Sequence, residues 1–208
     1  MENVIDKAKK IVFQNSANVV TAIGIILTVW FNMLIWNEPV DYLLIFLLTA
    51  SIGISDLLDG WLSRRWKIGS SMGGFLDKFR DKLFSCSVFA YFIYQLWNWS
   101  NGIWLGLIKG LIILILAIEL FLVLIWIIGF VKGCDTNSHL TGKIKTGFYF
   151  TAISWWFCFK CLEDLLQKQL TGDAYYFVLI ILLFIGSIYG ILSVAAYIQR
   201  DSSFAQDN

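Results

Sequence analysis

Long apolar stretches, separated by short polar segments, follow one another along nearly the whole chain. A helix that crosses a bilayer needs about 20 predominantly apolar residues. Helices are expected because lipid offers no hydrogen-bond partner to backbone N–H and C=O groups. Six stretches have the required length, namely 18–36, 41–63, 78–98, 103–131, 146–164 and 174–198. The pattern therefore predicts an all-α, polytopic membrane protein with six transmembrane helices.

The polar segments set the predicted domain limits and the orientation. Residues 18–200 form one domain, 1–17 form a basic N-terminal segment, and 201–208 form a C-terminal tail. The basic segment is either an amphipathic helix on the membrane surface or a plain tail that sets the topology. With a cytoplasmic N-terminus, most of the 16 Lys and Arg residues fall on the cytoplasmic side, as the positive-inside rule requires. We therefore predict that both termini are cytoplasmic.

The composition agrees with this class of protein. Charged residues make up 15% of the chain, against about 25% in soluble domains, so there are too few charges to coat a water-facing surface. The net charge of +1 gives no basic face of the kind that nucleic-acid binding requires, and no nucleic-acid partner is expected. The four cysteines are interpreted as packing residues, and nothing in the sequence requires an oxidising compartment.

Four aspartates flank the connection between the second and third predicted spans. Asp56 and Asp59 are three residues apart at the end of one span, and Asp77 and Asp81 are four residues apart at the start of the next. At these spacings each pair lies on one face of its helix. A tight connection between the spans would bring the two faces together at the cytoplasmic side of the membrane.

This quartet of aspartates predicts a metal site. Clustered carboxylates repel one another unless a cation lies between them, and ligands that are all oxygen suit a hard ion such as Mg²⁺ or Mn²⁺. A pair of ions can clamp the attacking and leaving oxygens of a phosphoryl transfer, so two ions are expected. Arg64 could contact a phosphate here, and Gly60, Gly73 and Gly74 would let a ligand approach the backbone closely.

Three alternatives to this metal-assisted chemistry fit the sequence less well. A solvated loop accounts for Lys78, Arg80 and Lys82 as ordinary interfacial charges, but it accounts poorly for Asp56 and Asp59, because acids that close an apolar span are costly and usually functional. A cation transporter with an acidic site would distribute its acids along several spans, whereas these cluster at one side of the membrane. An inactive scaffold would not need four intact aspartates.

The same segment resembles the signature of the CDP-alcohol phosphatidyltransferase family, which reads D-x-x-D-G-x-x-A-R, about eight residues, then G-x-x-x-D-x-x-x-D. Seven residues match it in identity and spacing: Asp56, Asp59, Gly60, Arg64, Gly73, Asp77 and Asp81. Ser63 replaces the alanine of the family, one small residue for another. The resemblance implies transfer of a phosphatidyl group from CDP-diacylglycerol to an alcohol, with release of CMP.

The resemblance also implies roles by position. Asp56, Asp59 and Asp77 would be metal ligands, and Asp81 would be the general base on the acceptor hydroxyl and a possible fourth ligand. Arg64 would contact the diphosphate of the donor, while Gly60 and Gly73 would leave room for the cytidine. The complete set of residues expected to bind the CDP donor is Asp56, Gly60, Ser63, Arg64, Gly73 and Asp77.

Over most of its length the chain is also similar to the bacterial phosphatidylglycerophosphate synthases. This similarity implies sn-glycerol 3-phosphate as the acceptor and the bacterial cytoplasmic membrane as the location. The segment Gly142-Lys143-Ile144-Lys145-Thr146 matches their G-K-x-K-T element, and Lys143 and Lys145 could reach the acceptor phosphate from the cytoplasmic side. Cardiolipin synthases of the CDP-alcohol type, which use phosphatidylglycerol, and enzymes with inositol-phosphate acceptors remain alternatives.

The chain departs from those synthases at three positions. Gly24 and Ile118 stand where the synthases usually have arginine, and Lys78 replaces the proline of their D-P-x-A-D-K stretch.

Two features inside the predicted spans have open interpretations. Glu119 lies deep in the fourth span, where an acid needs a partner, and that partner is either a lysine or a polar cavity. Gly102, Gly106 and Gly110 repeat every four residues, a spacing typical of small-residue faces that pack closely in membranes. This glycine face would serve either a homodimer or packing within the chain.

Overall fold

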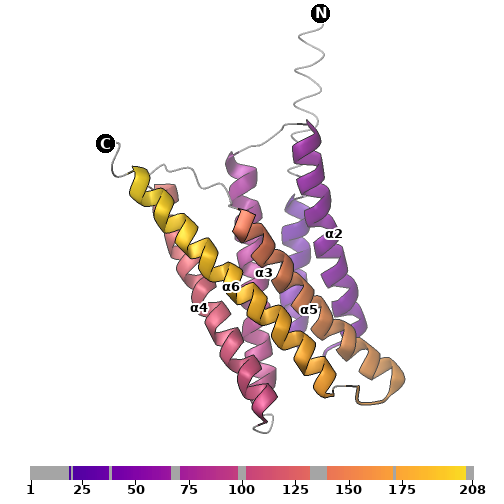
Figure 1. The fold of residues 1–208 in the computed structure, drawn as a ribbon. Helices are drawn as coiled ribbons and strands as arrows, with labels where there is room; N and C mark the ends of the chain where they lie inside the picture. Colours follow the sequence, from indigo (N-terminus) through magenta and orange to yellow (C-terminus); the bar gives the residue numbers. More distant parts are fainter. Residues whose placement is uncertain are drawn as a thin grey trace, which may run out of the picture. The chain divides into compact units, whose positions relative to one another are not determined.

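Helices account for nearly all of the chain that the structure, a computed structural model, describes. The description covers residues 19, 21–37, 39–66, 71–97, 102–131, 140–170 and 172–204, and is limited to the backbone at 59–66, 71–75, 77, 130–131 and 200–204. The helices are a first helix at Thr21–Ile35 and then α2 at Tyr42–Trp66, α3 at Ser71–Trp97, α4 at Ile103–Val131, α5 at Leu140–Leu166 and α6 at Asp173–Phe204 (Figure 1). No strand occurs in these ranges, so the predicted all-α class is confirmed. The predicted basic segment 1–17 lies outside the described residues.

The helix ends follow local sequence signals. The Asp41 carboxylate accepts a hydrogen bond of 3.0 Å from the Leu44 N–H, which caps the start of α2 by satisfying a donor that has no partner within the helix. At the end of α5, Gln167 has a φ of 50° and the Lys168 N–H donates to the Glu163 carbonyl at 3.3 Å. This combination is a Schellman motif, and it ends the helix where the chain turns toward α6.

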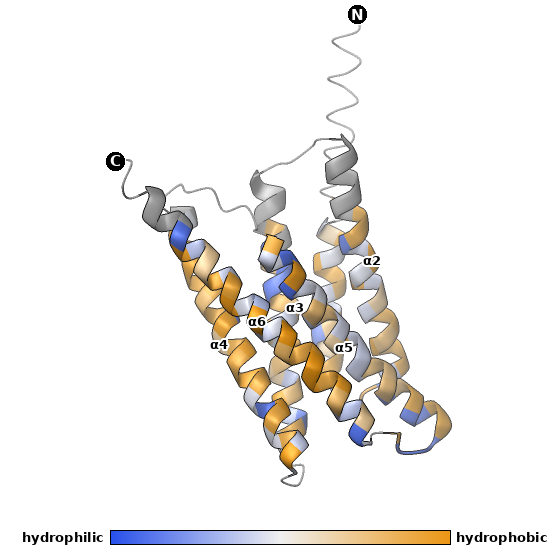
Figure 2. Ribbon diagram, viewed as in Figure 1, coloured by the Kyte–Doolittle hydropathy of each residue, from blue (hydrophilic) through white to orange (hydrophobic). Residues whose placement is uncertain are grey.

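The helices differ in how well they suit a bilayer. The segments Ile103–Gly129 of α4 and Asp173–Gln199 of α6 are long and apolar enough to cross a membrane, and Figure 2 shows apolar residues along most of both helices. The first helix and α2 contain shorter apolar stretches, Thr21–Ile35 and Tyr42–Leu58. The two long helices indicate a membrane protein, while the six-span topology stays a prediction.

The helices belong to two compact units, Met1–Phe84 and Ser85–Asn208, and the division falls within α3. In the first unit, Phe31 of the first helix packs against Phe84 of α3 with ring centroids 5.1 Å apart. Aliphatic residues of the first helix and α2, such as Ile35 and Ile45, are also buried. The contact between Phe31 and Phe84 joins the first helix to α3.

In the second unit an aromatic core joins α3 to α5. Phe92 stacks on Trp156 with ring centroids 4.4 Å apart, and Phe89 meets the Tyr149 ring edge-on at 5.3 Å. Helix α6 packs against both α4 and α5, and its close approach occurs at Gly186. A Cβ at Gly186 would lie 2.7 Å from the Tyr149 ring, so a side chain there would clash.

The two sets of spaced glycines therefore have different environments. Gly186 and Gly190 of α6 are pressed against neighbours, since a Cβ at Gly190 would lie 3.1 Å from the Ile118 side chain. At Gly102, Gly106 and Gly110, no described atom lies within 4 Å of the place where a Cβ would be. The predicted glycine face therefore does not pack against another described part of the chain. The homodimer stays a prediction.

Candidate active site

The four aspartates of the predicted site belong to consecutive helices. Asp56 and Asp59 lie in α2, which ends at Trp66, and Asp77 and Asp81 lie in α3, which begins at Ser71. Each pair is therefore on one helix, as its spacing predicted. The side chains of several predicted residues are outside the described part, so their roles stay predictions: Asp59, Gly60, Ser63, Arg64, Gly73 and Asp77.

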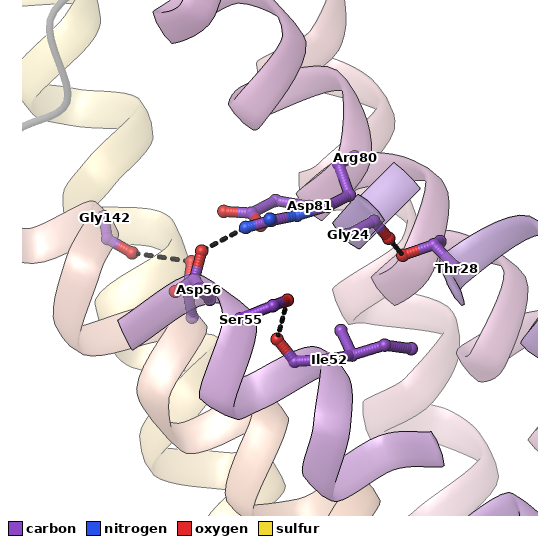
Figure 3. Close-up of polar contacts among 9 residues, drawn as sticks. Gly24, Thr28, Ile52, Ser55, Asp56, Arg80, Asp81 and Gly142 are labelled. Carbon is purple, nitrogen blue, oxygen red and sulfur yellow. Dashed lines mark hydrogen bonds and ion pairs between the residues drawn. The ribbon is translucent and has the colours of Figure 1, made fainter. Parts of the chain in front are cut away.

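Asp56 and Asp81 come together at the guanidinium of Arg80. The Arg80 Nη2 donates a hydrogen bond to Asp56 Oδ1, and the same nitrogen lies 3.5 Å from Asp81 Oδ1 (Figure 3). Because one nitrogen contacts both carboxylates, the oxygens from α2 and α3 point toward a common centre. The Asp56 side chain is 49% exposed and that of Asp81 is 36% exposed, while the Arg80 side chain is only 1% exposed. In this Arg80 cluster a buried cation contacts two carboxylates that are partly exposed.

The interpretation of Arg80 as an ordinary interfacial charge was wrong. A buried charge is costly unless it is paired, and here Asp56 and Asp81 supply the pairing. The sequence carried a weak signal, since Arg80 is next to Asp81, but the contact with Asp56 joins different helices and has no sequence spacing to reveal it. Arg80 is thus a residue of this site that the sequence pattern missed.

Space for the guanidinium comes from a glycine on the first helix. A Cβ at Gly24 would lie 2.5 Å from Arg80 Nη1 and 3.2 Å from its Cδ, so any other residue there would require the arginine side chain to shift. The Thr28 hydroxyl, one turn further along, donates to the Gly24 carbonyl at 2.8 Å, and the Ser55 hydroxyl donates to the Ile52 carbonyl at 2.7 Å (Figure 3). Each of these two hydroxyls thus donates to a carbonyl of its own helix.

A second charged cluster lies in the other unit. The Lys145 ammonium of α5 donates to the Glu119 carboxylate of α4, and the two side chains are 4% and 1% exposed. The Lys145 nitrogen also lies 5.6 Å from the centroid of the Tyr149 ring, within range of a cation–π attraction. Of the two partners considered for Glu119, the structure has the lysine. Lys143, by contrast, is exposed.

The Arg80 cluster has the donor chemistry that a hard divalent cation requires. Mg²⁺ and Mn²⁺ favour oxygen ligands, and the Asp56 and Asp81 carboxylates converge while remaining partly open to solvent. Among the residues whose side chains the structure describes, no group of three or more His, Cys, Asp or Glu could hold a metal ion. Asp56 and Asp81 therefore have the ligand chemistry of a metal site, and the Arg80 guanidinium contacts both of their carboxylates.

A comparison with protein families matches residues 14–198 to the CDP-alcohol phosphatidyltransferases. The matched segment runs from before the first helix to the last turns of α6, so it contains both charged clusters. Members are membrane-associated phosphotransferases of class EC 2.7.8 that move a phosphatidyl group from a CDP-alcohol to an acceptor, and they generally depend on a divalent metal. Because the match extends over most of the 208 residues, this protein belongs to the CDP-alcohol phosphatidyltransferase family.

Proposed function

We propose that this enzyme transfers the phosphatidyl group of CDP-diacylglycerol to sn-glycerol 3-phosphate, giving phosphatidylglycerophosphate and CMP. The observation that carries the proposal is the convergence of Asp56 and Asp81 on one guanidinium nitrogen, with both carboxylates still partly exposed. These residues match the first and last aspartates of the family signature. In this proposal, two consecutive helices present to the substrate the carboxylates that the reaction needs.

The proposed bond changes involve the acceptor hydroxyl and the diphosphate of the donor. The hydroxyl oxygen forms a bond to the phosphorus that carries diacylglycerol, and the bond from that phosphorus to the CMP oxygen breaks. Asp81 accepts the hydroxyl proton as general base, a role that its 36% exposure permits. The ion pair with Arg80 fixes the orientation of this carboxylate before the acceptor arrives.

The donor site is proposed to use the remaining signature residues. Asp56, Asp59 and Asp77 would hold Mg²⁺ or Mn²⁺, and a bound ion would neutralise charge on the diphosphate. Arg64 would contact the diphosphate, and Gly60, Ser63 and Gly73 would leave room for the nucleotide. Two ions are proposed, because a pair of ions can clamp the attacking and leaving oxygens of the transfer.

The acceptor phosphate is proposed to bind near the start of α5. Lys143 is exposed there and would contact the phosphate directly. Lys145 is buried against Glu119, and we assign it the supporting role of holding this end of α5 in place. The similarity to phosphatidylglycerophosphate synthases supports glycerol 3-phosphate as the acceptor, while phosphatidylglycerol and inositol phosphate are the competing acceptors.

The proposed setting is the cytoplasmic face of a bacterial inner membrane, with both termini on that side. The placement of Lys and Arg residues along the sequence supports this orientation. A homodimer could use the glycine face of α4, where no described neighbour approaches Gly102, Gly106 or Gly110.

The test is release of CMP by the purified protein supplied with CDP-diacylglycerol, Mg²⁺ and one alcohol at a time. We expect release with glycerol 3-phosphate, and its loss with a chelator and in Asp81→Asn. Asp164→Asn is the matched control, because it makes the same chemical change at an exposed aspartate near the end of α5. Release only with phosphatidylglycerol would make the enzyme a cardiolipin synthase. Absence of release with every alcohol would refute the proposed reaction.

A further inference from the structure

Gly24 of the first helix and Arg80 of α3 share one confined space. The Arg80 side chain is 1% exposed and is among the largest fully buried side chains of the described residues. Its Nη1 and Cδ lie 2.5 Å and 3.2 Å from the place where a Cβ at Gly24 would be. The guanidinium therefore lies where it does because residue 24 has no side chain.

From this position the guanidinium contacts carboxylates on two helices. Its Nη2 donates a hydrogen bond to Asp56 Oδ1 and lies 3.5 Å from Asp81 Oδ1 (Figure 3). A guanidinium is planar and rigid, so a displacement of Nη1 also moves Nη2. The space beside Gly24 thus controls the contacts of Arg80 with both carboxylates.

A methyl group at position 24 would act on the arginine more than on the fold. Gly24 lies within the first helix, where alanine is favoured over glycine, so the backbone accepts the change. The atom in closest conflict is the end of a long, flexible side chain, so the guanidinium would move and the helices would stay in place. The expected consequence is a folded protein in which Asp56 and Asp81 have lost their common contact.

We infer that Gly24 is a positioning residue for the transfer reaction. Its missing side chain leaves the space from which Arg80 orients the Asp81 carboxylate and joins it to Asp56. The inference rests on the proposed function, in which Asp81 is the general base. It adds to that function a residue of the first helix, outside the aspartate signature, that acts through Arg80.

The first test is Gly24→Ala in the purified full-length protein, assayed by CMP release with the alcohol that the wild type uses. We expect kcat to fall by about 10- to 100-fold, since misplacing a reacting group by about 1 Å can cost on the order of 100-fold. The KM for the alcohol should change little, because a general base contributes in the transition state. The melting temperature should also change little, which distinguishes positioning from a structural role.

A double-mutant cycle then tests whether Gly24 acts through Arg80. Arg80→Lys keeps a cation but has no Nη1, so the closest conflict with a methyl group at position 24 is absent. This variant should have a lowered kcat of its own, and adding Gly24→Ala to it should lower kcat no further.

Two controls separate this effect from others. Gly106→Ala adds the same methyl group where no described atom lies within 4 Å of the new Cβ, and it should keep the wild-type kcat. Ser55 Oγ lies 3.3 Å from the Cβ position at Gly24, so Ser55→Ala would relieve a conflict with that hydroxyl. Combined with Gly24→Ala, it should not restore kcat.

Four results would overturn the inference. These are a wild-type kcat in Gly24→Ala, an equal loss of kcat when Gly24→Ala is added to Arg80→Lys, recovery of kcat by Ser55→Ala, and a large fall in the melting temperature of Gly24→Ala. In each case the wild type still releases CMP, so the proposed function stands and only the role of Gly24 is refuted. A wild type that releases no CMP with any alcohol refutes the proposed function itself.

Discussion

The two charged clusters of this protein use the same types of residue in opposite ways. In each, a buried cation on one helix meets a carboxylate on a preceding helix. Asp56 and Asp81 are 49% and 36% exposed around Arg80, whereas Glu119 is 1% exposed against Lys145. The carboxylates of the first cluster are partly exposed, whereas both members of the second ion pair are buried.

This difference separates a reactive site from a structural one. A carboxylate can bind a metal or accept a substrate proton only if some of its oxygen lone pairs remain accessible. A fully buried ion pair offers no such access, and its energetic importance is that neither partner can be removed alone without leaving an isolated buried charge. We therefore expect changes in the Arg80 cluster to affect chemistry, and changes in the Glu119 pair to affect stability.

The largest expected effect is on turnover at the open cluster. Asp81→Asn should lower kcat by about 10²- to 10⁴-fold, the usual contribution of a general base, because the amide cannot take the proton of the acceptor hydroxyl. The melting temperature should change little, since the carboxylate is partly exposed. Steady-state CMP release and thermal unfolding of the same preparation measure the two quantities. A variant that kept a tenth of the wild-type kcat would contradict the assignment of Asp81 as the base.

At the closed cluster the expected effect is a loss of stability. Glu119→Ala should lower the free energy of unfolding by about 3–5 kcal/mol, because it leaves the Lys145 charge buried without its carboxylate. Replacing both partners, with Glu119→Leu and Lys145→Met together, should recover most of this loss. The measurement is reversible unfolding of the purified protein in mixed detergent micelles. A double variant no more stable than Glu119→Ala would mean that lost packing, and not an isolated charge, causes the change.

A smaller effect is expected where α6 approaches the closed cluster. Gly186→Ala should cost about 1–3 kcal/mol of unfolding free energy, the usual range for overpacking, because the new Cβ would lie 2.7 Å from the Tyr149 ring. Tyr149 is 2% exposed, so its ring has little space into which to move. The same unfolding assay measures this change. An unchanged stability would mean that α5 and α6 separate easily at this point.

The smallest effect is expected at an open glycine, which provides the matched control for Gly186. Gly106→Ala adds the same methyl group on α4, where no described atom lies within 4 Å of the new Cβ. Since alanine favours a helix over glycine by about 0.5–1 kcal/mol, the monomer should become slightly more stable. The check is unfolding at low protein-to-detergent ratio, where the monomer predominates. A loss of stability as large as that of Gly186→Ala would show that contact with a neighbouring side chain does not decide the effect of the substitution.

The sequence by itself determined the helices and the placement of the aspartates on two of them. Apolar length is a local property, so the six predicted segments could be located without knowing what they pack against. The intervals between Asp56, Asp59, Asp77 and Asp81 are likewise local, and they correctly assigned one pair to each of two consecutive helices. The signature built on these intervals pointed to the family that the comparison then matched.

Only the tertiary structure decided which charges are buried and which glycines are in contact. Arg80 resembled its neighbours Lys78 and Lys82 in the sequence, and its burial depends on Asp56 and Gly24, which belong to other helices. The partner of Glu119 was open in the sequence as well, because Lys145 belongs to another helix. The glycines of α4 and α6 share one spacing, yet within the described part of the chain Gly186 and Gly190 of α6 meet a neighbour and Gly102, Gly106 and Gly110 do not. Local periodicity shows which residues share a helix face, but the partner of that face depends on how the helices pack.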